Sequence, residues 1–232
     1  MNPFPITCVV FDFDGTLSRL NIDFEGMRKK VSELIENYRI DHHQFANLYV
    51  LEMIKAVCAV FAAENRYETG TIFAGQAFRL IYDIEMEGAR KGNLLEGVTE
   101  MLCRLHRAHI KVGIITRNCL DAVYCVWPDV HSFCDALITR ESAVRVKPDP
   151  AHLQQILAIL GAAPGQTIMT GDHPMDIHVG KTVGTFTVGV LTGNSTEQSL
   201  IGAGADRIIK RASSIDDCLD LAGSRGNVMI MP

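Results

Sequence analysis

Two closely spaced aspartates follow an apolar run near the start of the chain. Residues 6–11 are almost wholly apolar and rich in β-branched side chains, as in a strand that is covered on both faces. Asp12 and Asp14 follow, and side chains two positions apart share one face of a strand. Two like charges at this spacing need a cation, a shared proton or both. Gly15 allows a tight turn and would leave backbone amides open to an anion.

A second apolar run, residues 112–115, ends at Thr116, and Arg117 and Asn118 follow it. A hydroxyl group and backbone amides at the end of a strand are natural donors to phosphate oxygens. In an open α/β sheet, sites lie at the carboxyl ends of the strands. We therefore expect Thr116 near the two aspartates, although a threonine alone would carry little information.

Lys147 lies just before a predicted helix at residues 151–160. Asp149 can cap that helix, and Pro150 can occupy its first turn. The cap fixes the position of Lys147 just outside the helix start. The lysine is therefore well placed to hold a positive charge toward a site.

The last part of the pattern is a predicted strand at residues 167–170 that runs into Gly171 and Asp172. Asp176 follows four positions after Asp172, and this spacing places two side chains on one face of a helix start. Together, the four segments supply carboxylates, a hydroxyl group and an amine. These groups are the parts of a phosphoryl-transfer site.

These segments resemble the four motifs of the haloacid dehalogenase (HAD) superfamily. The motifs here read DFDGT at 12–16, Thr116, Lys147 and GDHPMD at 171–176, and the resemblance extends from Val9 to about Asp206. The stretches around the motifs, such as residues 95–98 and 146–150, are similar to those of phosphoglycolate-phosphatase-like hydrolases.

The resemblance implies a Mg²⁺-dependent phosphatase that forms an aspartyl-phosphate. Asp12 would be the nucleophile and Asp14 the general acid and base. The implied metal ligands are the Asp12 side chain, the Asp14 carbonyl and the Asp172 side chain, with Asp176 in an outer position. The implied phosphate-binding residues are Gly15, Thr116, Arg117 and Lys147, and Thr116 and Lys147 would also serve catalysis.

The remaining sequence predicts two regions of different character. Residues 23–90 show helical spacing only, with helices expected near 24–38, 45–61 and 71–89. From residue 94 onward, strand and helix patterns alternate, which predicts a parallel sheet with covering helices. We expect an α/β fold with a Rossmann-like three-layer core, residues 1–18 and 93–232. An all-helical insertion, residues 19–92, would be the cap that such an insertion forms in the HAD family.

Composition limits the classes of partner. The net charge of −5 and the pI near 5.9 give no indication of nucleic acid or an anionic membrane surface as partner. The start of the chain does not resemble a signal peptide, and no stretch approaches the about 18 apolar residues of a membrane span. Seven dispersed cysteines without a CxxC pair indicate reduced thiols. We therefore expect a cytoplasmic protein. A small-molecule phosphate ester as substrate is what the family resemblance and its helical cap imply, and the oligomeric state is left open.

Other functions share parts of this pattern. A phosphomutase would use every core residue and return the phosphoryl group to a sugar, so the motifs alone leave it open. A dehalogenase would not need Asp14 as a proton donor. A phospho-receiver domain has a lone phosphorylated Asp and no helical insertion. The roles of Arg117, His173 and Arg28, a possible anion-binding residue of the first predicted helix, are also left open.

Overall fold

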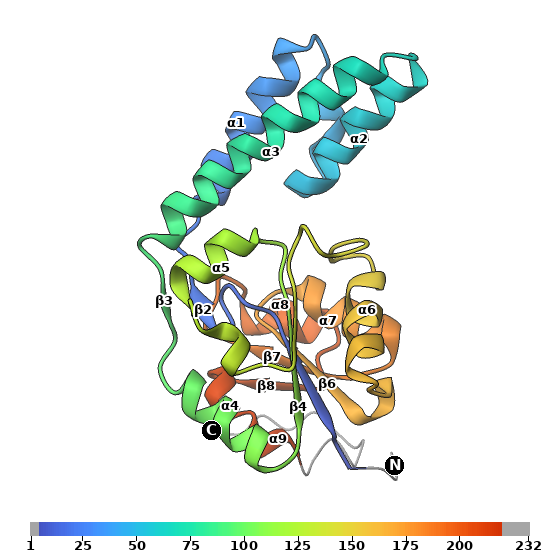
Figure 1. Ribbon diagram of the computed structural model, residues 1–232. Helices are drawn as coiled ribbons and strands as arrows, with labels where there is room; N and C mark the ends of the chain where they lie inside the picture. Colours follow the sequence, from blue (N-terminus) through green and yellow to red (C-terminus); the bar gives the residue numbers. More distant parts are fainter. Residues whose placement is uncertain (1–4, 220–232) are drawn as a thin grey trace. The chain divides into compact units, whose positions relative to one another are not determined.

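The computed structural model describes residues 5–219, and among these residues six parallel strands form one sheet (Figure 1). Its strands are β1 (Cys8–Phe11), β4 (Lys111–Ile115), β5 (Ala136–Ile138), β6 (Thr167–Gly171), β7 (Phe186–Val190) and β8 (Arg207–Ile209). The order across the sheet is β5-β4-β1-β6-β7-β8. β1, β6 and β7 are buried along their whole length, which explains why β1 is a continuous rather than an alternating apolar run and why β6 and β7 carry no charged residue.

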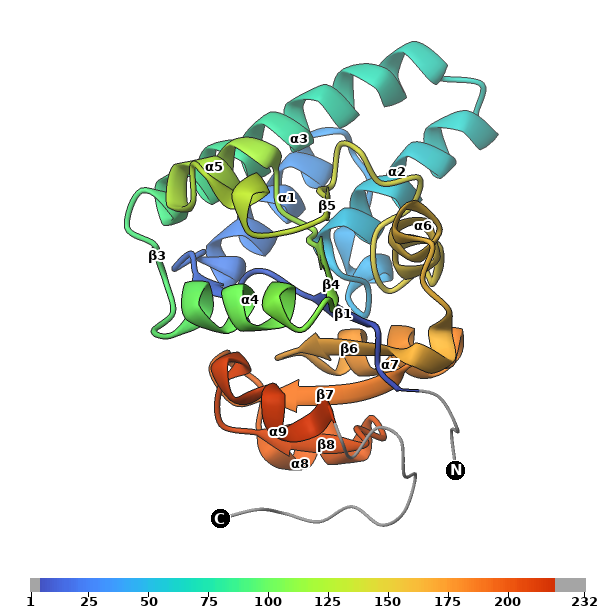
Figure 2. The ribbon, with the colours of Figure 1, turned by 60° about the horizontal axis from the view of Figure 1, so that its bottom comes forward.

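Helices cover both faces of this sheet. On one face, α6 (Ala151–Leu160) and α7 (Pro174–Val183) pack on Cys8, Val10 and Ile115. Figure 2 shows α4 (Val98–Arg107) and α6 on either side of β1 and β4. The other helical segments of this unit are α5 (Leu120–Val126), α8 (Glu197–Gly202), α9 (Asp216–Leu219) and the short 3-10 turns η2 (Val130–Ser132), η3 (Pro164–Gln166) and η4 (Ala212–Ser214). The predicted α/β, Rossmann-like three-layer fold is confirmed.

The connections between strands determine where a site can form. From β1 the chain goes on to β4 and β5 on one side, and then crosses to β6, β7 and β8 on the other. The strand order therefore reverses beside β1. In open α/β sheets, ligands bind outside the carboxyl ends of the strands at this reversal. Three of the four motif segments follow β4, β1 and β6, which are neighbouring strands, and the Lys147 segment lies in the loop between β5 and α6.

The chain divides into two compact units, and the second, Asn21–Lys91, is all helical. It contains α1 (Phe24–Asn37), the 3-10 turn η1 (His42–Phe45), α2 (Val50–Ala63) and α3 (Tyr67–Ala89). The helices bury a core of their own, which includes Val31, Val57, Phe61 and Phe73. Its two ends join the other unit at β2 (Ser18–Arg19) and β3 (Asn93–Leu94), which pair antiparallel.

Several predicted boundaries differ from the structure. The helix expected from residue 45 begins at Val50, because Asp41 caps a separate 3-10 turn that contains Phe45. The helix expected from residue 71 begins earlier, at Tyr67. The predicted strand at residues 6–11 begins at Cys8. Among the described residues, no helix is long and apolar enough to cross a membrane.

Candidate active site

The neighbouring strands β4, β1 and β6 bring the predicted site residues other than Lys147 to one edge of the sheet. Asp12 follows β1, and its amide donates to the Thr170 carbonyl of β6 at 2.8 Å. Thr116 follows β4, and its amide donates to the Ile138 carbonyl of β5 at 2.9 Å. These backbone bonds continue the sheet by one residue past the strands. They hold the first residue of each motif in a fixed place.

Three carboxylates meet at this edge. Ligand oxygens of Asp12, Asp172 and Asp176 lie within 4.8 Å of one another. Asp12 and Asp176 are buried, and Asp172 is half-buried. We call these three residues the acidic cluster. Asp176 belongs to the same cluster as Asp172, so the geometry does not set it apart as an outer residue.

The expected shared helix face of Asp172 and Asp176 is wrong. Asp172 lies before α7, and His173 is the N-cap of that helix. The His173 ring accepts from the Met175 amide at 3.1 Å, and the Asp176 carboxylate accepts from the His173 amide at 3.2 Å. The two aspartates meet because this capping box turns the chain. The same bonds give His173 a structural role.

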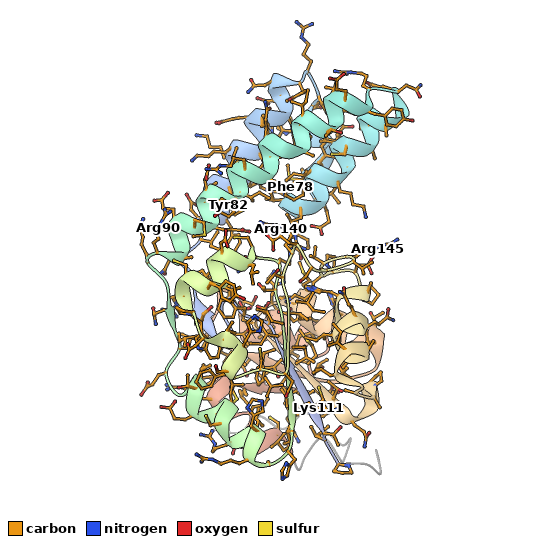
Figure 3. All side chains as sticks on the ribbon, in the orientation of Figure 1. Phe78, Tyr82, Arg90, Lys111, Arg140 and Arg145 are labelled. Carbon is orange, nitrogen blue, oxygen red and sulfur yellow. The ribbon has the colours of Figure 1, made fainter. Side chains whose placement is uncertain are left out.

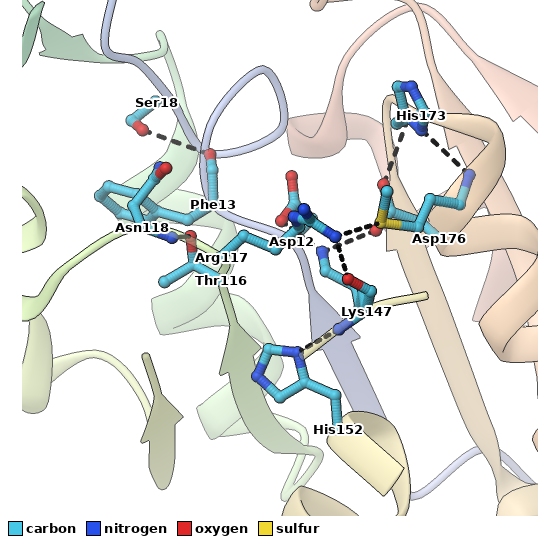
Figure 4. A network of polar contacts seen from close by, with 11 residues as sticks. Asp12, Phe13, Ser18, Thr116, Arg117, Asn118, Lys147, His152, His173 and Asp176 are labelled. Atoms are coloured by element: carbon cyan, nitrogen blue, oxygen red, sulfur yellow. Dashed lines mark hydrogen bonds and ion pairs between the residues drawn. The ribbon is translucent and has the colours of Figure 1, made fainter. Parts of the chain in front are cut away.

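Lys147 places its ammonium group in the acidic cluster (Figure 4). Its Nζ donates to Asp12 at 2.5 Å and to Asp176 at 2.6 Å. The side chain is 3% exposed, so its positive charge is shielded from water. Burial opposes the charge of Lys147, but Asp12 and Asp176 outweigh it and raise its pKa. The amine stays protonated.

The acidic cluster carries more negative charge than one lysine balances. Burial raises the pKa of Asp12 to about 7 against the opposing effect of Lys147. Burial, followed by repulsion from Asp12 and Asp176, raises the pKa of Asp172 to about 8. An additional cation would relieve both effects. The donors are all oxygen, the set that hard divalent cations prefer, so these residues fit Mg²⁺.

Glycines surround the carboxylates closely. A Cβ at Gly15 would lie 2.6 Å from the Asp172 carboxylate, and a Cβ at Gly193 would overlap it. A Cβ at Gly171 would likewise overlap the Asp176 carboxylate. Backbone therefore forms part of the wall around the acidic cluster, and side chains at these three positions would displace its oxygens.

Asp14 and Gly15 lie in a turn, not in the strand. β1 ends at Phe11, so the shared strand face expected for Asp12 and Asp14 does not form. The Asp14 carboxylate accepts from the Leu20 amide at 2.8 Å. Gly15 has the expected left-handed conformation, with φ of +80°. Its amide donates to the Ser18 carbonyl at 2.7 Å, so the expectation that this amide is open to an anion is wrong.

Thr116 and Arg117 lie at the β4 end of the site. The buried Thr116 accepts a hydrogen bond from the Asn118 amide on its hydroxyl oxygen at 3.1 Å. Arg117 donates to the Lys147 carbonyl, and its guanidinium also lies 3.6 Å from the Met175 sulfur. Arg117 therefore points along the site and contacts the loop that carries Lys147.

Sequence reasoning missed the segment after β7. The Thr192 hydroxyl donates to the Gly15 carbonyl at 2.6 Å, and Gly193 packs on Asp172. A signal was available, because residues 191–194 follow an apolar stretch at 186–190 in the part of the chain where strand and helix patterns alternate, and the end of a parallel strand there must reach the same sheet edge. Figure 3 marks the two ends of the sheet: Lys111 lies where β4 begins, and Arg140 lies beyond the opposite end.

Arg28, considered above as a possible anion-binding residue, lies in α1 and bonds within the helical unit. Arg28 donates to the carbonyls of Ala46 and Leu48 at 2.7 and 2.6 Å, and its guanidinium lies 2.8 Å from the Met53 sulfur. These bonds tie α1 to the segment before α2. They support a structural role for Arg28 within the helical unit.

Comparison with known proteins agrees with the geometry. A family model described as haloacid dehalogenase-like hydrolase matches residues 9–190, which is more than half of the chain. The chain belongs to this family of hydrolases. A pyrophosphatase PpaX from Bacillus velezensis is 29% identical over 222 residues, covering 90% of this chain and 94% of that protein.

Solved structures share the fold. A hydrolase from Pseudomonas syringae has a TM-score of 0.64 at 21% identity, and the match covers 92% of this chain and 98% of that one. A predicted phosphoglycolate phosphatase from Haemophilus somnus has a TM-score of 0.59 at 16% identity, covering 91% and 97%. At these identities the likeness concerns the fold.

Proposed function

We propose that the protein is a Mg²⁺-dependent phosphatase that hydrolyses small-molecule phosphate monoesters through an aspartyl-phosphate on Asp12. The observation that carries the proposal is the Asp12 carboxylate itself. It lies at the reversal point of the sheet, with the Lys147 ammonium 2.5 Å away and Asp172 and Asp176 beside it. The positive charge of Lys147 offsets the repulsion between the Asp12 carboxylate and an anionic phosphate.

The reaction has two steps, and the chain supplies the groups for both. An Asp12 oxygen attacks phosphorus while the bond from phosphorus to the ester oxygen breaks, and Asp14 gives its proton to the leaving alkoxide. A water molecule then attacks phosphorus and gives a proton to Asp14. The bond from phosphorus to the Asp12 oxygen breaks, which restores the Asp12 carboxylate and releases inorganic phosphate. The Leu20 amide, 2.8 Å from the Asp14 carboxylate, orients the acid.

The other residues lower the barrier electrostatically. Lys147 offsets charge on Asp12 before attack and on the phosphoryl oxygens afterward. Thr116 and Arg117 follow β4 at the same edge and bind the transferring oxygens. Asp12, Asp172 and the Asp14 carbonyl would hold Mg²⁺, which supplies charge neutralisation between the phosphate and the carboxylates. Asp176 fixes Lys147 through its 2.6 Å ion pair.

The helical unit limits the substrate. We propose that residues 19–92 act as a cap, which admits metabolite-sized esters and excludes a folded phosphoprotein. A substrate that is enclosed loses contact with bulk water, and this strengthens the electrostatic interactions around it. Relatives are named pyrophosphatases, so inorganic pyrophosphate belongs among the substrates to test.

The experiment is a phosphate-release screen with Mg²⁺ against metabolite monophosphates, pyrophosphate, sugar phosphates and p-nitrophenyl phosphate. We expect release from one or more small esters and none from the Asp12→Asn variant. Transfer of the phosphoryl group to a sugar without release would indicate a phosphomutase. Efficient action on a folded phosphoprotein, with no activity on any small molecule, would overturn the substrate class.

A further inference from the structure

His152 is a buried polar residue that the reaction above does not use. It lies in the first turn of α6, and its side chain is shielded from water. Its Nδ1 accepts a hydrogen bond from the Lys147 backbone amide at 3.2 Å, a contact drawn in Figure 4. A helix that covers the sheet therefore makes a side-chain contact with the residue that holds the Asp12 carboxylate.

The imidazole is suited to act as an acceptor here. Burial, followed by the positive charge of Lys147, lowers the pKa of His152 to about 3 against the opposing effect of the Ile138 backbone. The ring is therefore neutral in the working range of an enzyme. Because Nδ1 accepts from Lys147, the ring proton is on Nε2.

The bond from His152 completes a set of contacts around Lys147. The amide of Lys147 donates to His152, its carbonyl accepts from Arg117, and its ammonium bonds Asp12 and Asp176. Lys147 belongs to no helix or strand, so these contacts and its neighbours in the loop fix its backbone.

A second residue of α6 ties down another part of the same loop. The Gln155 side chain accepts from the Val144 amide at 2.8 Å and donates to the Ser142 carbonyl at 2.9 Å. Gln155 thus holds the loop without touching Lys147. Of these two α6 side chains, Gln155 bonds the loop at residues 142–144 and His152 bonds it at Lys147.

We propose that His152 is a positioning residue that sets the place of the Lys147 ammonium by holding the Lys147 amide. The proposal rests on the proposed function, in which Lys147 supports attack by Asp12. A lysine side chain has four rotatable bonds, so the position of its ammonium group is defined only when the backbone that carries it is fixed.

The test compares two amides at position 152. In His152→Asn the side-chain oxygen can take the place of Nδ1, whereas in His152→Gln the longer side chain puts its oxygen near the place of Nε2. We expect His152→Gln to lose about tenfold or more in kcat/KM for p-nitrophenyl phosphate and His152→Asn to keep most of it. Gln155→Ala, the matched control, loosens the loop and is expected to stay within about threefold of the wild type.

Amide hydrogen exchange of Lys147 gives a readout that does not depend on turnover. We expect faster exchange at Lys147 in His152→Gln, protection in His152→Asn, and a change confined to residues 142–144 in Gln155→Ala. Equal activity and equal Lys147 protection in the Asn and Gln variants would overturn the positioning role. Lys147→Met separates this failure from that of the proposed function: if Lys147→Met keeps full activity, the proposed role of Lys147 itself is wrong.

Discussion

Asp12 combines two properties that a single surface aspartate does not have. It is buried beside two further carboxylates, and it is bonded to a buried ammonium group. We expect Asp12→Asn to lower kcat at least about a hundredfold, or about 2.7 kcal/mol of barrier, because a carboxamide cannot attack phosphorus. The fold should persist, because Lys147 keeps its bond to Asp176 and one of three crowded charges is removed.

Initial rates of phosphate release and thermal unfolding of the same preparations check this prediction. Asp149→Asn is a suitable control, because the Asp149 carboxylate accepts from the Ala151 amide at 2.9 Å where α6 begins, and an asparagine keeps an acceptor there. A folded Asp12→Asn enzyme with more than about a hundredth of the wild-type kcat would rule out covalent catalysis by Asp12.

The buried His152 should make the free energy of unfolding depend on pH. Its pKa is lowered in the fold to about 3, so between that value and its ordinary value the unfolded chain binds more protons than the folded one. Stability therefore rises with pH through this window and is lost as the pH falls. Relative to His152→Asn, the wild type should lose about 2 kcal/mol of unfolding free energy between pH 7 and pH 5.

Urea unfolding at a series of pH values measures the difference. The comparison with His152→Asn cancels the titration of all groups that the two proteins share. A difference between the two proteins that is independent of pH would show that His152 does not titrate with a lowered pKa.

At the residue scale, the sequence predicts well which residues gather at the site, but it predicts their hydrogen bonds less well. Asp12, Lys147 and Asp172 all reach one sheet edge, as their positions after strands and before a helix suggest. The Gly15 amide and the Asp14 carboxylate differ from expectation because each finds a backbone partner, Ser18 or Leu20, in the turn after β1. Local hydrogen bonds of this kind depend on dihedral angles that residue spacing does not reveal.

At the scale of elements, the loop after β7 closes the acidic cluster with backbone. A side chain at Gly193 would overlap the Asp172 carboxylate. We expect Gly193→Ala to displace Asp172 and to lower kcat/KM about tenfold or more, with a smaller effect on stability. Gly202→Ala is the matched control, since a Cβ at Gly202 meets no atom within 4 Å.

Steady-state kinetics and thermal unfolding of the two alanine variants separate the effects. Equal activity in both variants would mean that the Gly193 backbone can move away from Asp172 without consequence for the site.

Elements in the sheet unit were predicted more closely than those in the helical unit. The helix predicted at 151–160 matches α6 residue for residue, and the strand predicted at 167–170 differs from β6 by one residue at its end. In the helical unit, residues 45–61 are apolar enough to be one helix by periodicity. The structure instead divides them, because Asp41 caps a 3-10 turn whose Phe45 is buried with Val31 and Val57. Tertiary packing decides this boundary.

At the scale of the whole molecule, the chain builds two units with separate cores. The helical unit packs on its own apolar residues, and the Asn21 side chain donates to the Lys91 carbonyl at 2.9 Å where the unit begins and ends. Because the first and last residues of the helical unit are bonded to each other, a long insertion after β1 begins and ends at one place. The insertion leaves the register of β1 against β4 and β6 intact.

The excess negative charge of the acidic cluster should make the stability of the whole molecule depend on a divalent cation. The acidic cluster raises the pKa of its own members, so a bound divalent cation should stabilise the folded chain. We expect Mg²⁺ to raise the melting temperature, with about 2.7 kcal/mol of stabilisation at a hundred times its Kd. A chelator should remove activity, and Mg²⁺ should restore it. Ca²⁺ should also raise the melting temperature but support little turnover, because its longer bonds and looser coordination misplace the attacking oxygen.

Two variants locate the effect. Asp172→Asn should lose the Mg²⁺-induced shift in melting temperature, whereas Glu33→Gln should keep it, since Glu33 is an exposed residue of α1 that pairs with Lys29. Calorimetric melting with and without Mg²⁺ gives this answer even for inactive variants. Full activity after exhaustive chelation, or an undiminished shift in Asp172→Asn, would show that the acidic cluster is not where the cation acts.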